Sequence, residues 1–528
     1  MNETKRIQIS DIRVMYRDGN RDFEAEAIHK AASLIAKRVG VTPRELKISK
    51  KSIDARRELS FVYTVTAVID SRARKITDPQ IKEYSEAELD LVRGTEKMEH
   101  RPVIVGFGPA GMFAGLLLAE NGYAPLILER GTDVEERTAA VERFISRGAF
   151  DVNTNIQFGA GGAGTFSDGK LTTRINDPLT AYVLKKLHEL GAPEDILYRA
   201  KPHIGTDILR RVVANADARI RELGGEIRYK TTAKAIGNGK LTAEGEVIPF
   251  DVLILATGHS ARDTYAELLD SGFAVEPKPF SVGVRAEHLQ SDIDRAMFKD
   301  HAGDPYLGHA EYQLSYRRGE RGCYTFCMCP GGTVVPSASE EYGVVTNGMS
   351  TRARDGRNAN AAVCVSVLPK DYGDDPHSAI EFQRHLERLA YTHGGGGYTA
   401  PMQTVGDLMN GKRGTEYSKI VPTYRDGDVK PCDFNEIFPG FVTEMLKAGI
   451  ADFGRKIKGY DESCVPLTGV ETRTSAPVRI LRGEDYVAVG KKGIYPCGEG
   501  AGYAGGIVSA AVDGIKVACK IIGKYEGK

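Results

Sequence analysis

The residues with the clearest chemistry lie in a glycine-rich turn near residue 106. An apolar β-branched run, Val103 to Val105, is followed at once by Gly106-x-Gly108-x-x-Gly111 and then by an apolar helical pattern. Gly106 permits a tight turn, Gly108 lets a pyrophosphate approach the backbone, and Gly111 lets the helix pack on the strand. The helix N-terminus offers free N–H groups and a partial positive charge. This order predicts the phosphate-binding turn of a dinucleotide site.

A carboxylate follows at the spacing that such a site needs. The next predicted strand, Pro125 to Leu128, ends at Glu129, with Arg130 beside it. An acid about 20 residues beyond the glycines hydrogen-bonds a ribose in dinucleotide-binding folds. Strand, glycines, helix, strand and acid in this order are far more specific than an isolated glycine motif.

Three further segments bear on the same site. GAGGAG at 159–164 leads into TFSDGKL rather than a helix, so we do not interpret it as a second dinucleotide turn. GAGYAG at 500–505 follows a predicted strand, GIYPC, and opens the helix IVSAAVDGIKVACKII, but too little chain follows for another strand with an acid. It can only complete a sheet begun elsewhere. DVLILATGH at 251–259 is an apolar strand that ends in Ala-Thr-Gly.

Composition limits the class of protein. At roughly 150 residues per domain, the 528 residues suggest three or four domains. Lys plus Arg number 71, equal to Asp plus Glu, which argues against a protein that coats nucleic acid or an anionic membrane. Apolar residues at 41% suffice for several cores, and eight cysteines are too few for a disulfide scaffold.

Membrane and export signals are not indicated. The stretch from Pro102 to Ala119 carries no charge, but its glycines and proline fit a strand, a turn and a helix better than a membrane span. The N-terminus has no apolar core of a secretory signal. We therefore expect a cytoplasmic protein with reduced thiols and without a metal site.

The N-terminal part is predicted to be separate. Residues 1–95 indicate a small α+β module, with strands near 7–14, 46–49 and 59–69 and a helix over 22–38. Residues 75–100 predict a short helix and a linker. The predicted loops of the N-terminal module are basic, with Arg44, Lys47, Lys50, Lys51, Arg56 and Arg57. These residues form either a patch for an anionic partner or a solvated surface, since acidic residues are interleaved with them.

Together these pieces resemble the flavoprotein superfamily typified by glutathione reductase and p-hydroxybenzoate hydroxylase, in which four such segments surround one FAD. More narrowly, the chain resembles a bacterial family of uncharacterised FAD-dependent dehydrogenases, described as NAD(P)/FAD-dependent oxidoreductases. The segments that carry this resemblance are KKSIDARRE near 50–58, GGAGTFSDGKL (161–171), ATGHSARDTY (256–265), KPFSVGVR (278–285), CMCPGGTVVPSASE (327–340), NGMSTRARDGRNAN (347–360) and GEGAGYAGGIVSAAVDG (498–514).

The resemblance implies an α/β fold with a split Rossmann-like FAD-binding domain. Its two parts would be residues 101–272 and 491–528, with an inserted mixed α/β substrate or cap domain at 273–490 and the small α+β module in front. It also implies the FAD contacts. Gly106, Gly108, Ala110 and Gly111 would hold the pyrophosphate, and Glu129 with Arg130 the adenosine ribose.

The remaining implied contacts come from later segments. Ala233 would meet the adenine through its backbone, although many members of the superfamily carry Val there, and Thr257 and Gly258 would flank the adenosine. Gly498, Glu499, Gly500, Gly506 and Ile507 would approach the ribityl chain and the ring. The loop at 159–170 would run along the flavin through Gly162, Gly164, Thr165, Asp168, Gly169 and Lys170. We expect FAD to be bound non-covalently.

Candidates for catalysis are few. Lys170 could stabilise reduced flavin or simply pair with Asp168. His259 could be a general acid or base, or could cap a turn. Cys327 and Cys329, which would face the same side of a strand, could be a redox pair, half of a metal site or packing residues. Arg354, Arg357 and Asn358 could grip an acidic substrate or form a polar surface loop.

These features predict an FAD-dependent oxidoreductase that moves a hydride and acts on a small-molecule substrate of unknown identity. Because the sequence offers no second complete dinucleotide unit, we do not expect a dedicated NAD(P)H domain of the disulfide-reductase type. NAD(P)H binding in the shared pocket and direct oxidation of an organic substrate both stay open as electron sources. Two other classes are kept: a flavin-dependent protein that modifies tRNA or another nucleic acid, and a non-catalytic flavin-binding protein. The oligomeric state is not indicated.

Overall fold

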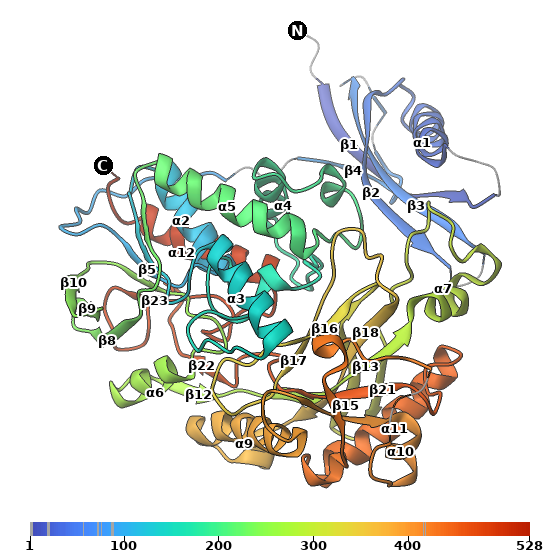
Figure 1. Cartoon of the computed structure of the whole chain (residues 1–528). Helices are drawn as coiled ribbons and strands as arrows, with labels where there is room; N and C mark the ends of the chain where they lie inside the picture. The colour runs from blue at the N-terminus through green and yellow to red at the C-terminus, as the bar shows by residue number, and fades with distance from the viewer. Residues whose placement is uncertain are drawn as a thin grey trace.

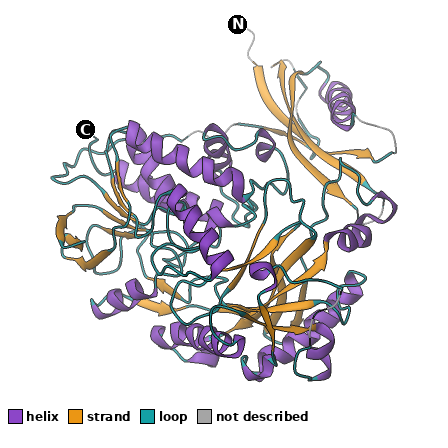
Figure 2. Ribbon diagram, in the orientation of Figure 1, coloured by secondary structure: helices purple, strands orange, loops and turns teal. Residues whose placement is uncertain are grey.

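The computed structural model describes residues 4–17, 22–55, 58–70, 73–74, 76–85, 89–415, 417 and 419–527. Three bodies of secondary structure are visible in Figure 1: a small sheet with α1 at the upper right, a parallel sheet with its helices at the upper left, and a larger sheet below. Figure 2 shows one group of helices beside the strands of the upper-left body and another along the lower edge of the larger body.

The N-terminal module is an antiparallel sheet covered on one face by a helix. The strand order is β2-β3-β1-β4, with β1 (Thr4–Met15), β2 (Arg44–Asp54), β3 (Ser60–Asp70) and β4 (Ile81–Glu83). Helix α1 (Phe23–Val39) begins after Asp22, whose side chain accepts a hydrogen bond from the Ala25 N–H, and ends at Gly40. Its apolar stripe is buried against the sheet, which confirms the predicted module.

Two expectations for this region were wrong. The basic residues Arg44, Lys47, Lys50 and Lys51 lie within strand β2 rather than in loops, and Arg56 and Arg57 lie outside the described residues. The described part of 76–100 contains no helix. Instead β4 pairs with β1 and buries Ile81, because the open edge of β1 offers backbone hydrogen bonds that an isolated short helix could not match.

The dinucleotide-type domain is built on a parallel sheet of five short strands in the order β23-β11-β5-β6-β7. Alternate side chains point to opposite faces of the sheet. Ile104 and Ile127 pack toward the helices, whereas Val103, Val105 and Leu128 pack toward a second, antiparallel sheet. The strands are β5 (Val103–Val105), β6 (Leu126–Leu128), β7 (Glu226–Arg228), β11 (Leu253–Leu255) and β23 (Ile494–Pro496).

Helices cover one face of this sheet and a three-stranded antiparallel sheet, in the order β10-β9-β8, covers the other. The helices of this domain are α2 (Pro109–Glu120), α3 (Val134–Arg147), α4 (Leu179–Glu189), α5 (Thr206–Glu222), α6 (Arg262–Asp270) and α12 (Ile507–Ile522). The small sheet consists of β8 (Ala233–Gly237), β9 (Lys240–Ala243) and β10 (Glu246–Pro249). Because β23 pairs with β11 and α12 packs on α2, the C-terminal segment completes the domain, as predicted.

Between β11 and β23 the chain builds the larger, mainly antiparallel sheet in the order β14-β15-β18-β13-β21-β19-β20. Its strands are β13 (Phe280–Leu289), β14 (Ser315–Arg318), β15 (Arg321–Cys329), β18 (Asn358–Val367), β19 (Ala400–Thr404), β20 (Val429–Pro431) and β21 (Pro466–Glu471). Two strand pairs accompany it, β12 (Val275–Pro277) with β22 (Val478–Ile480), and β16 (Thr333–Pro336) with β17 (Thr346–Met349). Its helices are α7 (Gln290–Phe298), α8 (Pro369–Tyr372), α9 (Pro376–Gly394), α10 (Val405–Asn410) and α11 (Gly440–Lys456).

This arrangement confirms the predicted α/β fold with a split Rossmann-like domain and a mixed inserted domain. The antiparallel pair of β12 and β22 lies where the chain leaves the parallel sheet and where it returns. The two larger bodies therefore face each other across the ends of strands β5 and β11.

Candidate functional site

A cavity of about 1310 Å³ lies between the parallel sheet and the inserted domain. Pockets for single small ligands usually measure roughly 300–1,000 Å³. The cavity runs from the turn after β5, past the loop at 162–164, to side chains of strands β13 and β15. It therefore has room for a dinucleotide and for a second molecule beside it.

The turn after β5 forms one end of this cavity. Gly106 has a φ of 101°, and a Cβ there would lie 2.3 Å from the Ala256 carbonyl oxygen. A Cβ on Gly111 would lie 2.0 Å from the Gly106 oxygen, so both positions need glycine for packing. At Gly108 the nearest atom to such a Cβ is 3.8 Å away, and this residue lines the cavity. Gly108 also caps α2 without a side chain, which leaves the first N–H groups of the helix for a ligand.

The acid predicted for the ribose is fixed by the backbone. Glu129 is only 5% exposed but lines the cavity. Its carboxylate accepts hydrogen bonds from the N–H groups of Phe107 at 2.8 Å, Gly131 at 2.9 Å and Gly159 at 3.0 Å. Three N–H donors orient the carboxylate, so its remaining lone pairs can accept hydroxyl donors from a ligand.

The neighbours predicted for the adenosine also line the cavity. Arg130 donates to Asp263 at 3.0 Å, and its guanidinium lies over the Phe158 ring. Ala233, at the start of β8, and Thr257 and Gly258, after β11, line the same end. These residues come from three different segments of the chain, and the parallel sheet and the small antiparallel sheet bring them together.

A second helix N-terminus meets the cavity from the C-terminal segment. α12 begins after Gly506 without a side-chain cap, and both Gly506 and Ile507 line the cavity. The preceding turn packs against the first one: a Cβ on Gly498 would lie 2.7 Å from the Cβ of Ala110, and one on Gly500 would lie 2.3 Å from the Gly258 oxygen. The turn is thus locked to the turn after β5.

Glu499 is the only carboxylate within this second turn. It lines the cavity, and burial raises its pKa to about 7, although the nearby Lys278 ammonium acts in the opposite direction. Burial also lowers the pKa of Lys278, which lines the cavity as well. The two side chains give this part of the cavity a carboxyl group and an amine that exchange protons more readily than usual near neutral pH.

The loop at 159–170 contributes in two ways. Gly162 and Gly164, at a short 3₁₀ turn (Gly162–Phe166), line the cavity, as does Lys170. Thr165, Asp168 and Gly169, predicted as flavin contacts, lie beneath this wall: the Thr165 hydroxyl donates to the Ala160 oxygen, and Asp168 is fully buried. They support the wall instead of forming its surface.

Lys170 and Asp168 form the predicted ion pair, with 2.7 Å between Nζ and Oδ2. Arg354 joins from the other side, donating from Nε to Asp168 at 2.9 Å, and Glu311 lies 3.6 Å from Lys170. Burial opposes the charge of Asp168, but the Lys170 and Arg354 cations outweigh it and lower the carboxyl pKa. Burial likewise opposes the charge of Lys170, and the two carboxylates outweigh it and raise its pKa. Lys170 is therefore a fixed cation in the cavity wall.

The three residues expected to grip a substrate are placed elsewhere. Arg354 is committed to Asp168 and Glu311, because a buried carboxylate needs a counter-charge. Asn358 donates to Glu287 and to the Val421 oxygen, and the Arg357 side chain is exposed. The segment ties the inserted domain to the loop at 168–170 and does not line the cavity.

His259 lines the cavity, with its Nδ1 2.9 Å from the Ser260 hydroxyl. Burial lowers its pKa to about 3, and the cations of Arg473 and Arg262 add to this effect. The imidazole is therefore neutral at physiological pH. Such a low pKa makes it a weak base, and the neutral ring keeps one N–H that can donate a hydrogen bond but is a very weak acid.

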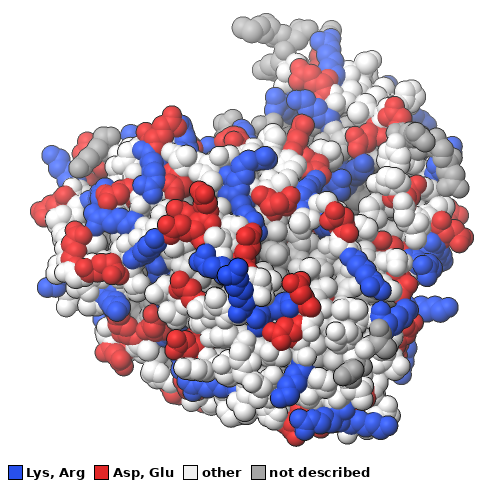
Figure 3. All heavy atoms as spheres, viewed as in Figure 1, with Lys and Arg blue, Asp and Glu red and all other residues white. Residues whose placement is uncertain are grey.

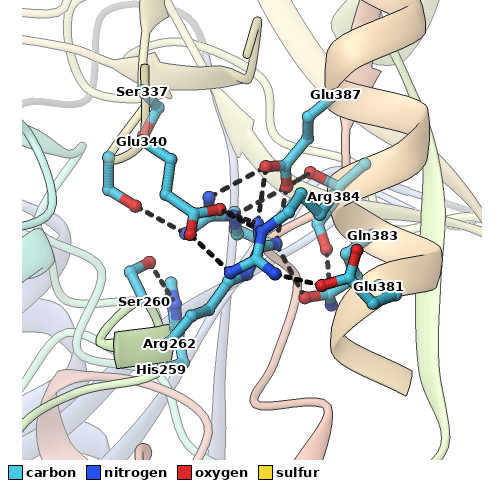
Figure 4. Close-up of polar contacts among 12 residues, drawn as sticks. His259, Ser260, Arg262, Ser337, Glu340, Glu381, Gln383, Arg384 and Glu387 are labelled. Atoms are coloured by element: carbon cyan, nitrogen blue, oxygen red, sulfur yellow. Dashed lines mark hydrogen bonds and ion pairs between the residues drawn. The ribbon is translucent and has the colours of Figure 1, made fainter. Parts of the chain in front are cut away.

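Sequence reasoning missed a buried cluster of ion pairs behind His259 (Figure 4). Glu387 of α9 accepts from Arg262 at 2.8 Å and from Arg473 at 2.8 Å, so one carboxylate bridges two guanidinium groups. Arg262 also pairs with Glu340, which in turn pairs with Arg384. Arg473 lines the cavity, so the cluster links the cavity wall to α6 and α9. Its members are far apart in sequence, and no local pattern marks them.

The described residues contain neither a membrane-spanning helix nor a cluster of metal ligands. In that part of the chain no helix is long and apolar enough to cross a membrane. The same residues contain no group of three or more His, Cys, Asp and Glu side chains placed to hold a metal ion.

The fold and the site define the class of protein: an α/β protein with a split dinucleotide-binding domain and an inserted domain over a shared cavity. Residues 279–474 match the model of a family described as "FAD-dependent protein, C-terminal domain-like". A protein of Clostridium beijerinckii, described as "Uncharacterized protein", is 46% identical over 495 residues, which are 91% of this chain and 93% of that protein. The chain belongs to the family of this clostridial protein, a family of FAD-dependent proteins.

Solved structures show only a coarse likeness. CtdE in complex with FAD matches with a TM-score of 0.30 at 11% identity, covering 80% of this chain and 84% of that chain. Glycine oxidase from Bacillus cereus matches with a TM-score of 0.35 at 12% identity, covering 81% of this chain and 99% of that chain. The likeness does not extend to a particular reaction.

Proposed function

We propose that this chain is an FAD-dependent oxidoreductase that binds FAD non-covalently and acts on a small organic molecule. The observation that carries the proposal is a single cavity that meets two uncapped helix N-termini, those of α2 and α12, with Glu129 at one end and the inserted domain at the other. The shape and donor set fit a dinucleotide, and the family description names FAD.

Different groups of residues would contact different parts of the cofactor. Gly108 and Ala110 at the start of α2 would hold the pyrophosphate, and Glu129 would accept hydrogen bonds from the adenosine ribose. The segment of Ala233 and that of Thr257 would surround the adenosine. The α12 N-terminus and Glu499 would lie toward the ring end. FAD when bound supplies hydride transfer, and the protein supplies its position and the surrounding charge.

The inserted domain would supply the substrate compartment. Strands β13 and β15 and the segment before β14 contribute aromatic and polar side chains to the cavity, among them Tyr312, Tyr324 and Phe326. Lys170, held as a cation by its carboxylate partners, would favour negative charge that develops near it. The cavity suits a small molecule better than a polymer.

The mixed charge of the protein surface makes nucleic acid a poor candidate partner. Figure 3 shows that basic and acidic side chains alternate over the visible face, including the region of the N-terminal sheet. The basic strand β2 is partly neutralised, since Lys51 pairs with Glu24 at 2.8 Å. A nucleic-acid reader would need a continuous basic surface.

NADH or NADPH, as electron donor, would have to enter the shared cavity.

The test is spectroscopy on the purified full-length protein. A flavin absorption spectrum is expected, with FAD released into the supernatant after acid precipitation. NADH and then NADPH are added under anaerobic conditions, followed by a panel of small reduced metabolites. Bleaching by a nicotinamide supports a reductase, and bleaching by a metabolite supports a dehydrogenase. A protein that carries no flavin and takes up none from added FAD would overturn the proposal. A yellow precipitate would overturn non-covalent binding.

A further inference from the structure

Two cysteines of strand β15 lie where the cavity meets the buried core of the inserted domain. Cys327 lines the cavity, and Cys329 is fully buried. The register between β15 and β18 shifts between Phe326 and Cys329, and Cys327 has a φ of 44°, so Cys327 lies in a β-bulge. Bulges redirect side chains and occur beside active sites. This bulge presents one of the two thiols to the cavity.

The two thiol groups are held as neighbours. The Cys329 thiol donates a hydrogen bond to the Cys327 backbone oxygen, with 3.3 Å between Sγ and O. Two glycines fix Cys329 from behind. A Cβ on Gly348 would lie 2.9 Å from the Cys329 Sγ, and one on Gly332 would lie 3.0 Å from its Cβ. Cys329 therefore has little space to turn away from Cys327.

Cations face the pair from two different elements. Arg285 of β13 is fully buried and donates from Nη1 to the Cys327 backbone oxygen at 2.9 Å. Lys170 lines the same cavity as Cys327, and its cation favours the thiolate form of Cys327 by lowering the pKa. The facing carboxylates are each paired with one of these cations, Glu471 with Arg285 at 2.9 Å and Asp168 with Lys170 at 2.7 Å.

The remaining titratable neighbours, Cys364 and Tyr312, are buried, and burial raises the pKa of each. They stay neutral near pH 7. The neighbouring Cys329 thiol lowers the pKa of Cys327 to about 6, against burial and with help from the Arg285 and Lys170 cations. The same contact raises the pKa of Cys329. One thiolate and one thiol is the charge state that thiol–disulfide exchange requires.

We propose that Cys327 and Cys329 form a reactive dithiol that reduces small disulfides entering the cavity, with Cys327 attacking and Cys329 resolving. This activity goes beyond the proposed flavin chemistry and does not depend on it. In the first step the Cys327 thiolate attacks one sulfur of a disulfide R–S–S–R, a Cys327–S–S–R bond forms, and the R–S–S–R bond breaks to release RS⁻.

In the second step the Cys329 sulfur attacks the Cys327 sulfur of the mixed disulfide. A Cys327–Cys329 bond forms, the bond to R breaks, and the proton of Cys329 leaves with the second thiol as RSH. The substrate disulfide gains two electrons, and the two cysteine sulfurs lose them. An external dithiol such as dithiothreitol reverses the oxidation.

The first experiment needs no substitution. Full-length protein, as purified and reduced, is alkylated with limiting iodoacetamide between pH 5 and 9, and peptides are quantified by mass spectrometry. At pH 6 we expect Cys327 to react about tenfold faster than an ordinary thiol, after allowing for the lower nucleophilicity of a low-pKa thiolate. Cys464, which is partly exposed and outside the cavity, is the internal reference. Equal rates for Cys327 and Cys464 throughout would overturn the proposal.

The second experiment uses the disulfide of 2-hydroxyethanethiol as the probe. In the wild-type protein we expect a Cys327–Cys329 disulfide that dithiothreitol reopens. Cys329→Ser should stop at a stable mixed disulfide on Cys327, and Cys327→Ser should form neither product, while Cys464→Ser should behave as wild type. Mixed disulfide on Cys329 alone, or no product in the wild type, would exclude the assigned roles. Flavin absorbance is read in the same samples, so loss of cofactor and loss of thiol chemistry are distinguished.

Discussion

The Glu129 carboxylate accepts a hydrogen bond from the Phe107 backbone N–H at 2.8 Å, so the acid proposed to hold the ribose is tied directly to the glycine turn proposed to hold the pyrophosphate. Phe107 lies between Gly106 and Gly108, and its N–H cannot be deleted by a side-chain change. The position of the acid and the shape of the turn therefore depend on each other. A ligand that contacts both the Glu129 carboxylate and the turn would therefore bind to a preorganised site.

Glu129→Gln should weaken FAD binding. The amide keeps the size of the side chain, but it loses the negative charge that orients the N–H donors and accepts ribose hydroxyl groups. Hydrogen bonds to charged groups contribute about 1.5–3 kcal/mol, so a loss of roughly 10- to 150-fold in affinity is expected. Quenching of flavin fluorescence on titration measures it. Glu222→Gln, an exposed position on α5, should leave affinity unchanged. Equal affinities for both variants would contradict a role for Glu129.

Gly111→Ala should destabilise the protein. The added Cβ would lie 2.0 Å from the Gly106 oxygen, and that backbone cannot move without disturbing the turn. Overpacking of this kind costs typically about 1–3 kcal/mol. Thermal unfolding followed by circular dichroism gives the change. At Gly440, a Cβ meets nothing within 4 Å, so Gly440→Ala is the matched control and should not lower the Tm. Similar Tm values for both variants would show that the turn can adapt.

The parts of this structure that the sequence predicts are those in which neighbours in sequence are neighbours in space. Strand β5, the three glycines and α2 follow one another, so local spacing reports their geometry. The C-terminal helix was predicted at its observed bounds because an apolar stripe follows a glycine-rich turn. Glu129 was found by its spacing from the glycines alone.

The parts that could not be predicted depend on distant partners. Arg354 was a candidate substrate-binding residue because it lies in a polar segment. In the structure its guanidinium group instead pairs with Asp168, which is distant in sequence. Glu387 lies in an ordinary helical pattern, and only the fold shows that it holds two arginines. A short helix was expected within residues 75–100, but the described part of this segment forms β4, because the edge of β1 was free to pair.

Glu387→Gln should be among the most damaging single changes. It leaves Arg262 and Arg473, both buried, without the carboxylate they share. Removing one partner of a buried ion pair typically costs about 3–5 kcal/mol. Urea unfolding gives the difference. Glu381→Gln on the same helix removes an exposed partner of Arg384 and should cost less than about 0.5 kcal/mol. Equal costs would mean that the cluster does not stabilise the fold.

Acid should destabilise the protein through Asp168 and Glu387. Their cationic partners outweigh the effect of burial and lower both carboxyl pKa values. A carboxyl group with a lowered pKa binds more protons in the unfolded chain than in the folded one. The stability it contributes is therefore complete above the ordinary carboxyl pKa of about 4 and is lost as the pH falls below it. Tm measured from pH 6 to pH 2 should fall steeply below pH 4, and the fall should be shallower in Glu387→Gln. Parallel curves for the two proteins would contradict this assignment.

Glu499 should give the opposite pH dependence. Burial raises its pKa to about 7, so between the ordinary carboxyl pKa and pH 7 the folded protein keeps a proton that the unfolded chain has lost. The contribution of Glu499 to stability therefore falls as the pH rises from about 4.5 to 7. In FAD-free protein, Glu499→Gln should gain Tm relative to wild type as the pH rises through this range, because the amide does not ionise. A pH-independent Tm difference would mean that Glu499 ionises at its ordinary pKa, and that the cavity is more hydrated at α12 than the structure indicates.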